Sequence, residues 1–280
     1  MISLRAASRV LPLEAPVVMG VINATPDSFS DGGRYQDPSA ALAVATRMVA
    51  DGARILDIGG ESTRPGSEPP SIDEEIRRVV PVVQAVSTLD VLISVDTSRA
   101  PVIEAVAAAG AHLINDVRGL RQPDALAAVA RHGLGACIMH MQGEPVSMQA
   151  APHYQDVVAE VRAWLLQQIQ LCEAAGIARS HLVIDPGFGF GKTFAHNAAL
   201  MAQLECFTEL GVPLLIGVSR KSWVGQLTGR TVDERLAGSV ALATVAVLRG
   251  ARIVRAHDVA ATVDAVNVGY ACRRSQGESR

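Results

Sequence analysis

A short unit recurs along the chain and restricts the folds that it can adopt. In each copy, the end of a predicted helix is followed by a glycine and then by a run of apolar residues. Glycine takes the left-handed conformation that ends a helix, and a short apolar run after it is typical of a buried strand. The six copies read ADGARILDIGG (50–60), AAGAHLINDV (108–117), RHGLGACIMH (131–140), AAGIARSHLVID (174–185), ELGVPLLIGVSR (209–220) and LRGARIVRAHD (248–258).

The apolar runs predict eight strands that alternate with helices. These strands are Val17–Ile22, Ile55–Ile58, Leu92–Val95, Leu113–Ile114, Ala136–Met139, Leu182–Ile184, Leu214–Val218 and Ile253–Val254. Continuous apolar strands between helices indicate a parallel sheet that helices cover. Eight such units in about 250 residues predict an α/β protein, a (β/α)8 TIM barrel with a parallel eight-stranded core. An open doubly wound sheet is the alternative, and it is disfavoured because no G-x-G-x-x-G follows the first strand.

Local signals refine the helices and the extent of the domain. Ser71 and Glu74 have the spacing of a capping box at the start of a helix. Pro81 falls inside the same helical pattern and is expected to kink or shorten it. The elements together predict one domain over residues 1–280, with its core at about 17–272.

Composition excludes several classes of function. The 25 basic and 28 acidic residues give a net charge of -3 without a long basic run, so we expect no binding to nucleic acid or membrane surfaces. The longest apolar run, 240–248, is too short to span a bilayer, and no signal-peptide pattern is visible. Cys137, Cys172, Cys206 and Cys272 are widely spaced in apolar or helical contexts, so we expect buried free thiols in a cytoplasmic protein.

The stretch DPGFGFGKT (185–193) ends like a Walker A motif, but its spacing excludes one. The motif requires a glycine five residues before Gly191, and that position is Pro186, which has no N–H to offer a phosphate. The glycines instead predict a loop whose backbone approaches a ligand closely, with Phe188 and Phe190 as walls for an aromatic substrate. Packing in the core is the alternative for Phe188.

A polar residue stands at or near the C-terminal end of every predicted strand. These residues are Asn23, Asp57, Asp96, Asn115, His140, Asp185, Ser219 and His257. In a barrel such positions converge on one mouth, where active sites lie. A single polar residue there merely begins a loop, but polar residues after all eight strands predict a polar pocket.

Eight motifs resemble, in the same order, those of the dihydropteroate synthase family. They are MGVINATPDSFSDGG (19–33), DIGGESTRPG (57–66), SVDTS (94–98), INDV (114–117), MHMQG (139–143), DPGFGFGK (185–192), GVSRKS (217–222) and RAHD (255–258). The resemblance implies a pterin-binding (β/α)8 barrel and a transferase of folate biosynthesis. Such an enzyme condenses 6-hydroxymethyl-7,8-dihydropterin diphosphate with 4-aminobenzoate, giving 7,8-dihydropteroate and diphosphate. The family is a sulfonamide target and suggests a homodimer.

The resemblance implies a pterin site around Asp185. A buried carboxylate accepts two adjacent N–H donors of the pterin edge in a selective pairing. Asp96 and Asn115 would satisfy the remaining ring donors and acceptors, although a helix cap is the alternative for Asp96. Lys221 would donate to the pterin carbonyl and ring nitrogen, while Arg220 beside it is expected to be structural. The full pterin set is Asp96, Asn115, Met139, Asp185, Gly217 and Lys221.

The diphosphate leaving group implies a second set of residues at the same mouth. Mg²⁺ prefers oxygen ligands and often bridges phosphates with few protein contacts. By the resemblance, Asn23 supplies a side-chain oxygen to this metal, although a turn-forming role is the alternative for that residue. Arg64, Arg255 and His257 would hold the diphosphate oxygens, the last two at the end of the eighth strand, where barrels often bind phosphate.

The second substrate is a neutral aromatic amine with a carboxylate, so its attack requires no strong base. The resemblance implies that Ser219 binds the carboxylate and that Lys221 packs beside the ring. The implied 4-aminobenzoate set is Thr63, Arg64, Pro65, Phe190 and Ser219. The residues expected to be catalytic are Asn23, Thr63, Arg64, Lys221, Arg255 and His257.

The chemistry suggests that the C–O bond breaks before the amine attacks. The dihydropterin delocalises the resulting cation, while Mg²⁺ and the basic groups neutralise the departing charge. Loops 23–37 and 59–71 are long and glycine-rich, and we expect them to close over the site. One alternative is a pterin-binding methyltransferase, which would not require ESTRPG or SRKS. The other is a non-catalytic paralogue, which is disfavoured because Asn23, Thr63 and Arg64 are present.

Overall fold

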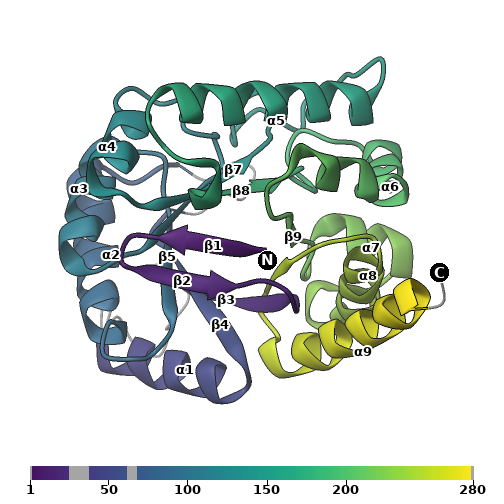
Figure 1. Ribbon diagram of the computed structural model, residues 1–280, viewed down its shortest axis with the longest axis horizontal. Helices are drawn as coiled ribbons and strands as arrows, with labels where there is room; N and C mark the ends of the chain where they lie inside the picture. Colours follow the sequence, from purple (N-terminus) through teal and green to yellow (C-terminus); the bar gives the residue numbers. More distant parts are fainter. Residues whose placement is uncertain (1, 25–37, 62–67, 279–280) are drawn as a thin grey trace.

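The computed structural model describes residues 2–24, 38–61 and 68–278, and these form an α/β barrel. Eight strands make one parallel sheet in the order β8-β7-β6-β5-β4-β3-β10-β9. The helices lie around the outside of this sheet (Figure 1). The predicted fold, a nearly closed (β/α)8 barrel with a parallel eight-stranded core, is therefore confirmed.

The chain forms a β-hairpin and then alternates strands with helices. The strands are β1 (Ser3–Ala6), β2 (Arg9–Pro12), β3 (Val17–Asn23), β4 (Ala53–Gly59), β5 (Leu92–Asp96), β6 (Leu113–Asp116), β7 (Gly135–Met139), β8 (Leu182–Asp185), β9 (Leu215–Gly217) and β10 (Ile253–Ala256). The α-helices are α1 (Pro38–Ala50), α2 (Ile72–Val86), α3 (Ala100–Ala109), α4 (Ala125–His132), α5 (Val157–Ala174), α6 (Phe194–Ala202), α7 (Ser222–Thr228), α8 (Leu236–Leu248) and α9 (Val259–Glu278). Three short 3-10 helices are η1 (Arg179–His181), η2 (Leu204–Leu210) and η3 (Val232–Glu234). All eight predicted barrel strands are present.

The ring of strands is joined between its first and last members and is weakest between β8 and β9. β3 pairs in parallel with β10, with Val17 opposite Ile253. β8 and β9 meet only at an isolated bridge between Ile184 and Leu214, where the Ile184 N–H donates to the Pro213 carbonyl at 3.0 Å. Pro213 has no N–H of its own to add to this seam. β9 is correspondingly shorter than the run that the sequence predicts.

The glycines of the repeated unit adopt the predicted conformation. Their φ angles are 102° at Gly52, 107° at Gly110, 60° at Gly133, 90° at Gly176, 73° at Gly211 and 103° at Gly250. All lie in the left-handed region, where a side chain would be strained. The prediction that these glycines end helices is confirmed.

Helix α2 confirms one local signal and contradicts another. The Ser71 hydroxyl accepts a hydrogen bond from the Glu74 N–H at 3.2 Å, so Ser71 is the N-cap. The Glu74 carboxylate binds Arg78 at 2.8 Å, and the structure records no return bond to the cap. Pro81 lies inside α2, which continues to Val86. The predicted shortening is therefore wrong, because the apolar face beyond Pro81 is buried and holds the helix together.

An N-terminal hairpin of β1 and β2 closes the bottom of the barrel (Figure 1). Leu4, Ala6, Leu11 and Leu13 are buried in it. They pack against one residue from each barrel strand, namely Met19, Ile55, Leu92, Leu113, Cys137, Val183, Leu215 and Ile253. The hairpin lies outside the predicted core range of 17–272, because its short strands precede the repeated unit.

We expect Leu4→Ala to destabilise the protein through this hairpin. Leu4 is completely buried, so its truncation leaves a cavity and lowers the free energy of unfolding by about 2–5 kcal/mol. Val10→Ala on the neighbouring strand is the matched control, since Val10 is 57% exposed and its truncation changes stability by about 0.5 kcal/mol or less. Urea denaturation measures the free energy of unfolding of both variants. Equal midpoints for the two variants would contradict the hairpin's role as part of the core.

The cysteine prediction holds only in part. Cys137 and Cys172 are buried free thiols, Cys206 is half-buried, and Cys272 is exposed. The prediction of burial is wrong for Cys272, because the sequence context does not reveal which side of the long final helix faces outwards. Across the described ranges, no helix is both long and apolar enough to cross a membrane.

Candidate active site

A charged cluster lies inside the barrel, towards the C-terminal ends of the strands. Arg255 on β10 binds two carboxylates, with Nε 2.6 Å from Asp57 Oδ2 and Nη2 3.2 Å from Asp96 Oδ2. Asn115 donates from Nδ2 to the same Asp57 oxygen at 3.0 Å. The hydroxyl of Ser94 donates to Asp57 Oδ1 at 2.6 Å. β4, β5 and β6 are consecutive in the sheet, and Arg255 reaches them from β10 on the other side of β3, so Asp96, Asn115 and Arg255 come together, as predicted.

Asp57 is the centre of this cluster, and the sequence analysis did not assign it to a substrate or a catalytic role. It lies within β4 rather than at its end, and its side chain is fully buried. A buried carboxylate requires donors on both oxygens, and Asp57 has them in Ser94, Asn115 and Arg255. The signal for it was an aspartate within an otherwise apolar strand. Its partners orient the groups that face the mouth.

Asp96 is a partner of Arg255 and not a helix cap. Arg99 occupies the N-cap position of α3, without a side-chain cap. Burial raises the pKa of Asp96, and the nearby charges of Asp57 and Asp116 add to this, while Arg255 acts against it. The Arg255 guanidinium therefore binds two carboxylates. Asp57 also accepts from Ser94 and Asn115, so the charge of Asp96 is the less completely compensated of the two.

Asp185 ends β8 and is buried close to two lysines. Its Oδ1 accepts a hydrogen bond from the Gly187 N–H at 2.7 Å. Burial raises the pKa of Asp185, while Lys221, the Gly187 N–H and Lys192 act in the opposite direction. Burial lowers the pKa of Lys221 to about 8, and Asp185 opposes that change. Within the described residues no bond to the second oxygen of Asp185 is recorded, and that oxygen can accept from another donor, as a heterocycle-binding group requires.

Lys221 lies across the loop that follows β8. Its ammonium donates to the Phe188 carbonyl and lies 4.6 Å from the centre of the Phe190 ring. Gly217 on β9 lies beside it, because a Cβ there would be in ordinary van der Waals contact with Lys221 Nζ, at 3.8 Å. Lys221, Phe190 and Gly217 therefore lie together, as expected of residues assigned to adjoining substrate sites. Met139 is buried in an apolar cluster that Phe190 packs against.

The glycine-rich loop approaches protein backbone closely, and its approach to a ligand stays a prediction. Gly187 has φ 73°, and a Cβ there would lie 1.9 Å from the His140 carbonyl oxygen. A Cβ on Gly191 would lie 2.5 Å from the Gln142 carbonyl oxygen. The loop after β8 is thus pressed against the loop after β7. This close contact positions Asp185 and the residues that follow it.

Lys192, which occupies the place of the lysine in a Walker A motif, is buried and bonds to other parts of the protein. Its Nζ is 3.0 Å from His140 Nδ1 and donates to the carbonyls of Phe190 at 3.0 Å and His140 at 3.3 Å. Burial lowers the pKa of Lys192 to about 7. The next residue, Thr193, caps helix α6. The absence of a Walker motif, inferred from Pro186, agrees with this arrangement.

Two residues from the predicted pocket face elsewhere. His140 packs edge-on against Trp164 of α5, with ring centres 5.0 Å apart, so it belongs to the layer between strand and helix. Phe188 is completely buried and stacks on Trp223 at 5.6 Å, so it is a core residue and not a substrate wall. Side-chain direction at a strand end depends on the register of the barrel, which the sequence motifs do not specify.

Ser219 and His257 form the rim of the site. Ser219 Oγ accepts from the His257 N–H at 3.2 Å and lies 3.1 Å from His257 Nδ1. The surrounding protein lowers the pKa of His257, and the charges of Arg255 and Arg220 add to this. Arg220 Nε donates to Asp258 at 2.9 Å, so the structural role expected for Arg220 is supported by its contacts. The neutral His257 ring, exposed at the mouth, remains available to a ligand.

The site residues on loops 23–37 and 59–71 are described only where these loops join the barrel. Asn23 is exposed at the end of β3, where it pairs with Gly59 of β4. Thr63, Arg64 and Pro65 lie outside the described residues. The predicted closure of loops 23–37 and 59–71 concerns mostly residues beyond those that the structure describes.

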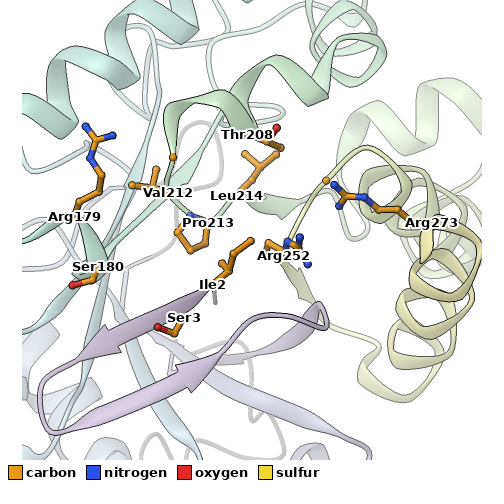
Figure 2. A pocket seen from close by; sticks show the side chains of 12 residues that line it. Ile2, Ser3, Arg179, Ser180, Thr208, Val212, Pro213, Leu214, Arg252 and Arg273 are labelled. Carbon is orange, nitrogen blue, oxygen red and sulfur yellow. The ribbon is translucent and has the colours of Figure 1, made fainter. Parts of the chain in front are cut away.

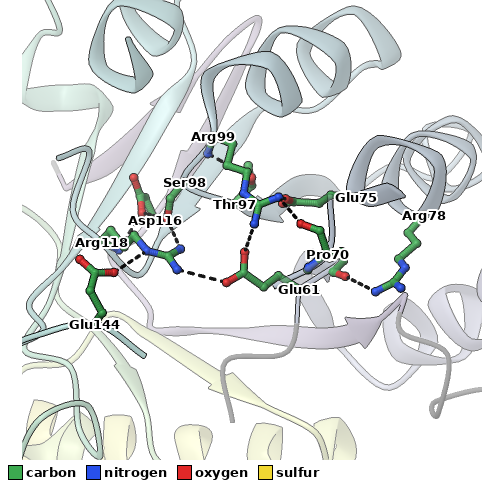
Figure 3. Close-up of polar contacts among 11 residues, drawn as sticks. Glu61, Pro70, Glu75, Arg78, Thr97, Ser98, Arg99, Asp116, Arg118 and Glu144 are labelled. Atoms are coloured by element: carbon green, nitrogen blue, oxygen red, sulfur yellow. Dashed lines mark hydrogen bonds and ion pairs between the residues drawn. The ribbon is translucent and has the colours of Figure 1, made fainter. Parts of the chain in front are cut away.

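A network that the sequence analysis missed anchors the stems of the second loop (Figure 3). The carboxylate of Glu61 binds Arg118 at 3.2 Å and Arg99 at 3.4 Å. Arg99 also contacts the buried Glu75 at 3.2 Å and donates to the Pro70 carbonyl at 2.7 Å. Both ends of the loop are therefore fixed to α2, α3 and the β6 loop. The arginines come from different strand ends, so their meeting depends on tertiary structure.

The fold and this site together define an α/β-barrel enzyme that binds a heterocycle at the C-terminal ends of its strands. The profile of the family described as "Pterin binding enzyme" matches residues 19–257. The chain belongs to the dihydropteroate synthase family. Dihydropteroate synthase of Escherichia coli strain K12 is 52% identical over 259 residues, covering 92% of each chain. That of Haemophilus influenzae is 48% identical over 269 residues, covering 96% of this chain and 98% of the relative.

Solved structures agree with this assignment. The Yersinia pestis enzyme, solved with a sulfonamide drug, has a TM-score of 0.92 and 50% identity, covering 98% of this chain and 100% of that one. The Xanthomonas albilineans enzyme with 4-aminobenzoic acid has a TM-score of 0.91 and 51% identity, covering 97% and 98%. The same enzyme with 7,8-dihydropteroate has a TM-score of 0.88 and 49% identity, covering 97% and 98%.

Proposed function

We propose that the strand-end site of this chain joins 6-hydroxymethyl-7,8-dihydropterin diphosphate to 4-aminobenzoate, releasing 7,8-dihydropteroate and diphosphate. The observation that carries this proposal is the buried Asp185 beside Lys221, with Arg255 two strands away on β10. An enzyme of this reaction requires an anion to hold the pterin and cations to stabilise the leaving group. Relatives about half identical to this chain were solved with 4-aminobenzoic acid or dihydropteroate.

The pterin binds at the inner end of the site. Asp185 accepts its adjacent N–H donors through the oxygen that does not bind Gly187, and Lys221 donates to the carbonyl edge. Asp96 and Asn115 hold the opposite edge. A pterin N–H donor favours the ionised form of Asp96, whose pKa is raised in the free site.

The diphosphate lies at the rim near β10. Arg255 uses Nε and Nη2 for Asp57 and Asp96, and within the described ranges no bond from its Nη1 is recorded. A guanidinium has five N–H donors, so Nη1 can donate to a phosphate oxygen without breaking the carboxylate pairs. His257 is exposed beside it, and Arg64 is the third expected contact. The leaving oxygen is thus stabilised by Arg255, a cation that Asp57 and Asp96 hold in position.

A magnesium ion fits this arrangement as a companion of the diphosphate. The described residues contain no group of three or more His, Cys, Asp or Glu side chains that could hold a metal. The exposed amide of Asn23 offers one neutral oxygen, which suits an ion that takes its other oxygens from phosphate and water. When bound, Mg²⁺ would neutralise charge that develops on the diphosphate.

The 4-aminobenzoate lies outside the pterin. Ser219 is placed to donate to its carboxylate, and Phe190 with the Lys221 stem forms one side of the ring site. Thr63, Arg64 and Pro65 of the second loop are the expected remaining contacts.

The bond between the pterin methylene and the diphosphate oxygen breaks first, and its electron pair leaves with diphosphate. The amine nitrogen then attacks the methylene and loses a proton to the solvent.

A single assay tests this function. Purified protein with the pterin diphosphate, 4-aminobenzoate and Mg²⁺ is expected to form dihydropteroate, and with the amine omitted it is expected still to release diphosphate slowly. Chromatography follows the pteroate and a phosphate-coupled assay follows the diphosphate. Cleavage that depends completely on the amine would contradict the proposed order. Absence of both products would favour a non-catalytic paralogue, and methyl transfer from a methylated folate would favour the methyltransferase alternative.

A homodimer and a cytoplasmic location remain predictions. The homodimer comes from the resemblance, and the location comes from the cysteines.

A further inference from the structure

A second pocket, with a volume of about 400 Å³, opens at the opposite end of the barrel from the strand-end site (Figure 2). Its walls come from the segments that lead into β8, β9 and β10, and from the start of the N-terminal hairpin. The volume falls within the range of small-molecule sites, roughly 300–1,000 Å³. None of its residues takes part in the contacts of the strand-end site.

One end of this pocket carries two guanidinium groups whose recorded hydrogen bonds, among the residues that the structure describes, go to backbone carbonyls. Arg252 donates to the carbonyls of Leu13 at 3.3 Å and Glu14 at 2.6 Å. Arg273 on α9 donates to the Val247 carbonyl at 3.5 Å. Among the ion pairs of the described residues, neither arginine has a carboxylate partner, and their labelled side chains lie near each other in Figure 2.

The third arginine of the pocket differs from these two. Arg179 binds both oxygens of Glu173, at 3.0 and 3.1 Å, and its charge is therefore already compensated. Burial and the charge of Arg273 lower the pKa of Arg252, and the opposing effects of Tyr270 and Glu14 do not overcome them. A guanidinium nevertheless keeps its proton. Two like charges therefore face a pocket without a counter-ion, and an anion that enters would relieve their repulsion.

An apolar side adjoins the cationic end, while Ser3, Ser180 and Thr208 add hydroxyl groups elsewhere in the lining. Ile2, Val212, Pro213 and Leu214 line the apolar side, with Ile2 and Pro213 near the middle of the view in Figure 2. Gly250 keeps the cationic end open, because a Cβ there would lie 2.6 Å from Thr208 Cγ2 and 3.5 Å from Arg273 Nη2. The pocket thus combines a charged end with an apolar side, which is the complement of an amphipathic anion.

We propose that this pocket binds a small organic anion, with a carboxylate or phosphate head group between Arg252 and Arg273 and an apolar body against Ile2 and Pro213. Carboxylate and phosphate oxygens match the N–H fork of arginine in the same way. The site is independent of the pterin reaction and lies beneath the seam between β8 and β9.

Isothermal titration calorimetry with hexyl phosphate, hexanoate and inorganic phosphate tests the proposal on the full chain. Wild-type protein is expected to bind one equivalent of at least one of the two tailed anions, and to bind inorganic phosphate at least tenfold more weakly. The stronger of the two tailed anions identifies the head group. Binding of inorganic phosphate as tight as that of both tailed anions would overturn the role of the apolar wall.

Two variants, each with a matched control, locate the binding. Arg273→Gln removes one charge of the pocket, and Ile2→Glu places an opposing charge at its edge, where Ile2 is 42% exposed and its replacement is compatible with folding. Each is expected to weaken binding at least tenfold. Arg131→Gln on α4 and Val10→Glu, at a 57% exposed hairpin position, carry the same charge changes elsewhere and are expected to bind like wild type. Equal affinity in Arg273→Gln and wild type, or no binding to wild type, would refute the site.

Discussion

Asp185→Asn is expected to weaken binding of the pterin by about 10- to 100-fold. The change replaces a buried anion, which has two oxygens that can accept, with a neutral amide that has one acceptor oxygen. A hydrogen bond to a charged group contributes about 1.5–3 kcal/mol, and the amide N–H₂ would face the pterin donors or the Gly187 N–H that now binds Oδ1. Calorimetry with 6-hydroxymethyl-pterin measures the change directly.

The matched control is Asp73→Asn in the first turn of α2, an exposed aspartate that belongs to none of the residue sets assigned to the site. It carries the same loss of charge and is expected to bind the pterin like wild type. Asp185→Asn with unchanged pterin affinity would show that another group anchors the heterocycle. The proposed reaction would then require a different pterin orientation in the barrel.

Arg255→Met is expected to lower the free energy of unfolding by about 3–5 kcal/mol, in addition to abolishing turnover. Removing one partner of a buried ion pair leaves its charge uncompensated. Asp57, whose side chain is fully buried, would lose the 2.6 Å contact to Nε, and Asp96 would lose its only recorded ion pair. Urea denaturation and the pteroate assay report the two effects separately.

A double variant separates stability from chemistry. Arg255→Met with Asp57→Asn removes both members of the pair, and Asn115 and Ser94 still flank the new amide. We expect part of the lost stability to return, while activity stays absent because no guanidinium reaches the leaving group. Recovery of activity in the double variant would argue against a role for Arg255 towards diphosphate. If Arg255→Met is too unstable to purify, Arg255→Lys provides the same comparison with the charge retained.

The strands and helix ends were predictable because each depends on adjacent residues. A glycine before an apolar run fixes a local backbone conformation, and this chain repeats that signal six times. The hairpin was not predictable in this way, since Leu4 and Leu13 reveal their burial only when the barrel floor exists. The helix through Pro81 likewise depends on packing against the sheet.

The site was predictable as a set of strand ends but not as a set of contacts. The strands of Asp96 and Asn115 are neighbours, and Arg255 reaches the same cluster from β10, two strands beyond β4, by the length of its side chain. The resemblance named all three. The partnership with Asp57 requires the register of β4, and the burial of Phe188 requires the position of Trp223 on α7. Glu61 was not singled out either, because its arginine partners come from the loop after β5 and the loop after β6.

The pairing of β3 with β10 has a consequence for how the protein is made. Val17 lies beside Ile253, so the outer edge of the first barrel strand has no partner until almost the whole chain has left the ribosome. Contacts between residues so distant in sequence form late, and an incomplete chain exposes apolar surface and unpaired edges meanwhile. A chain truncated before Ile253 would therefore lack one of the eight barrel strands and expose apolar surface that chaperones and proteases recognise.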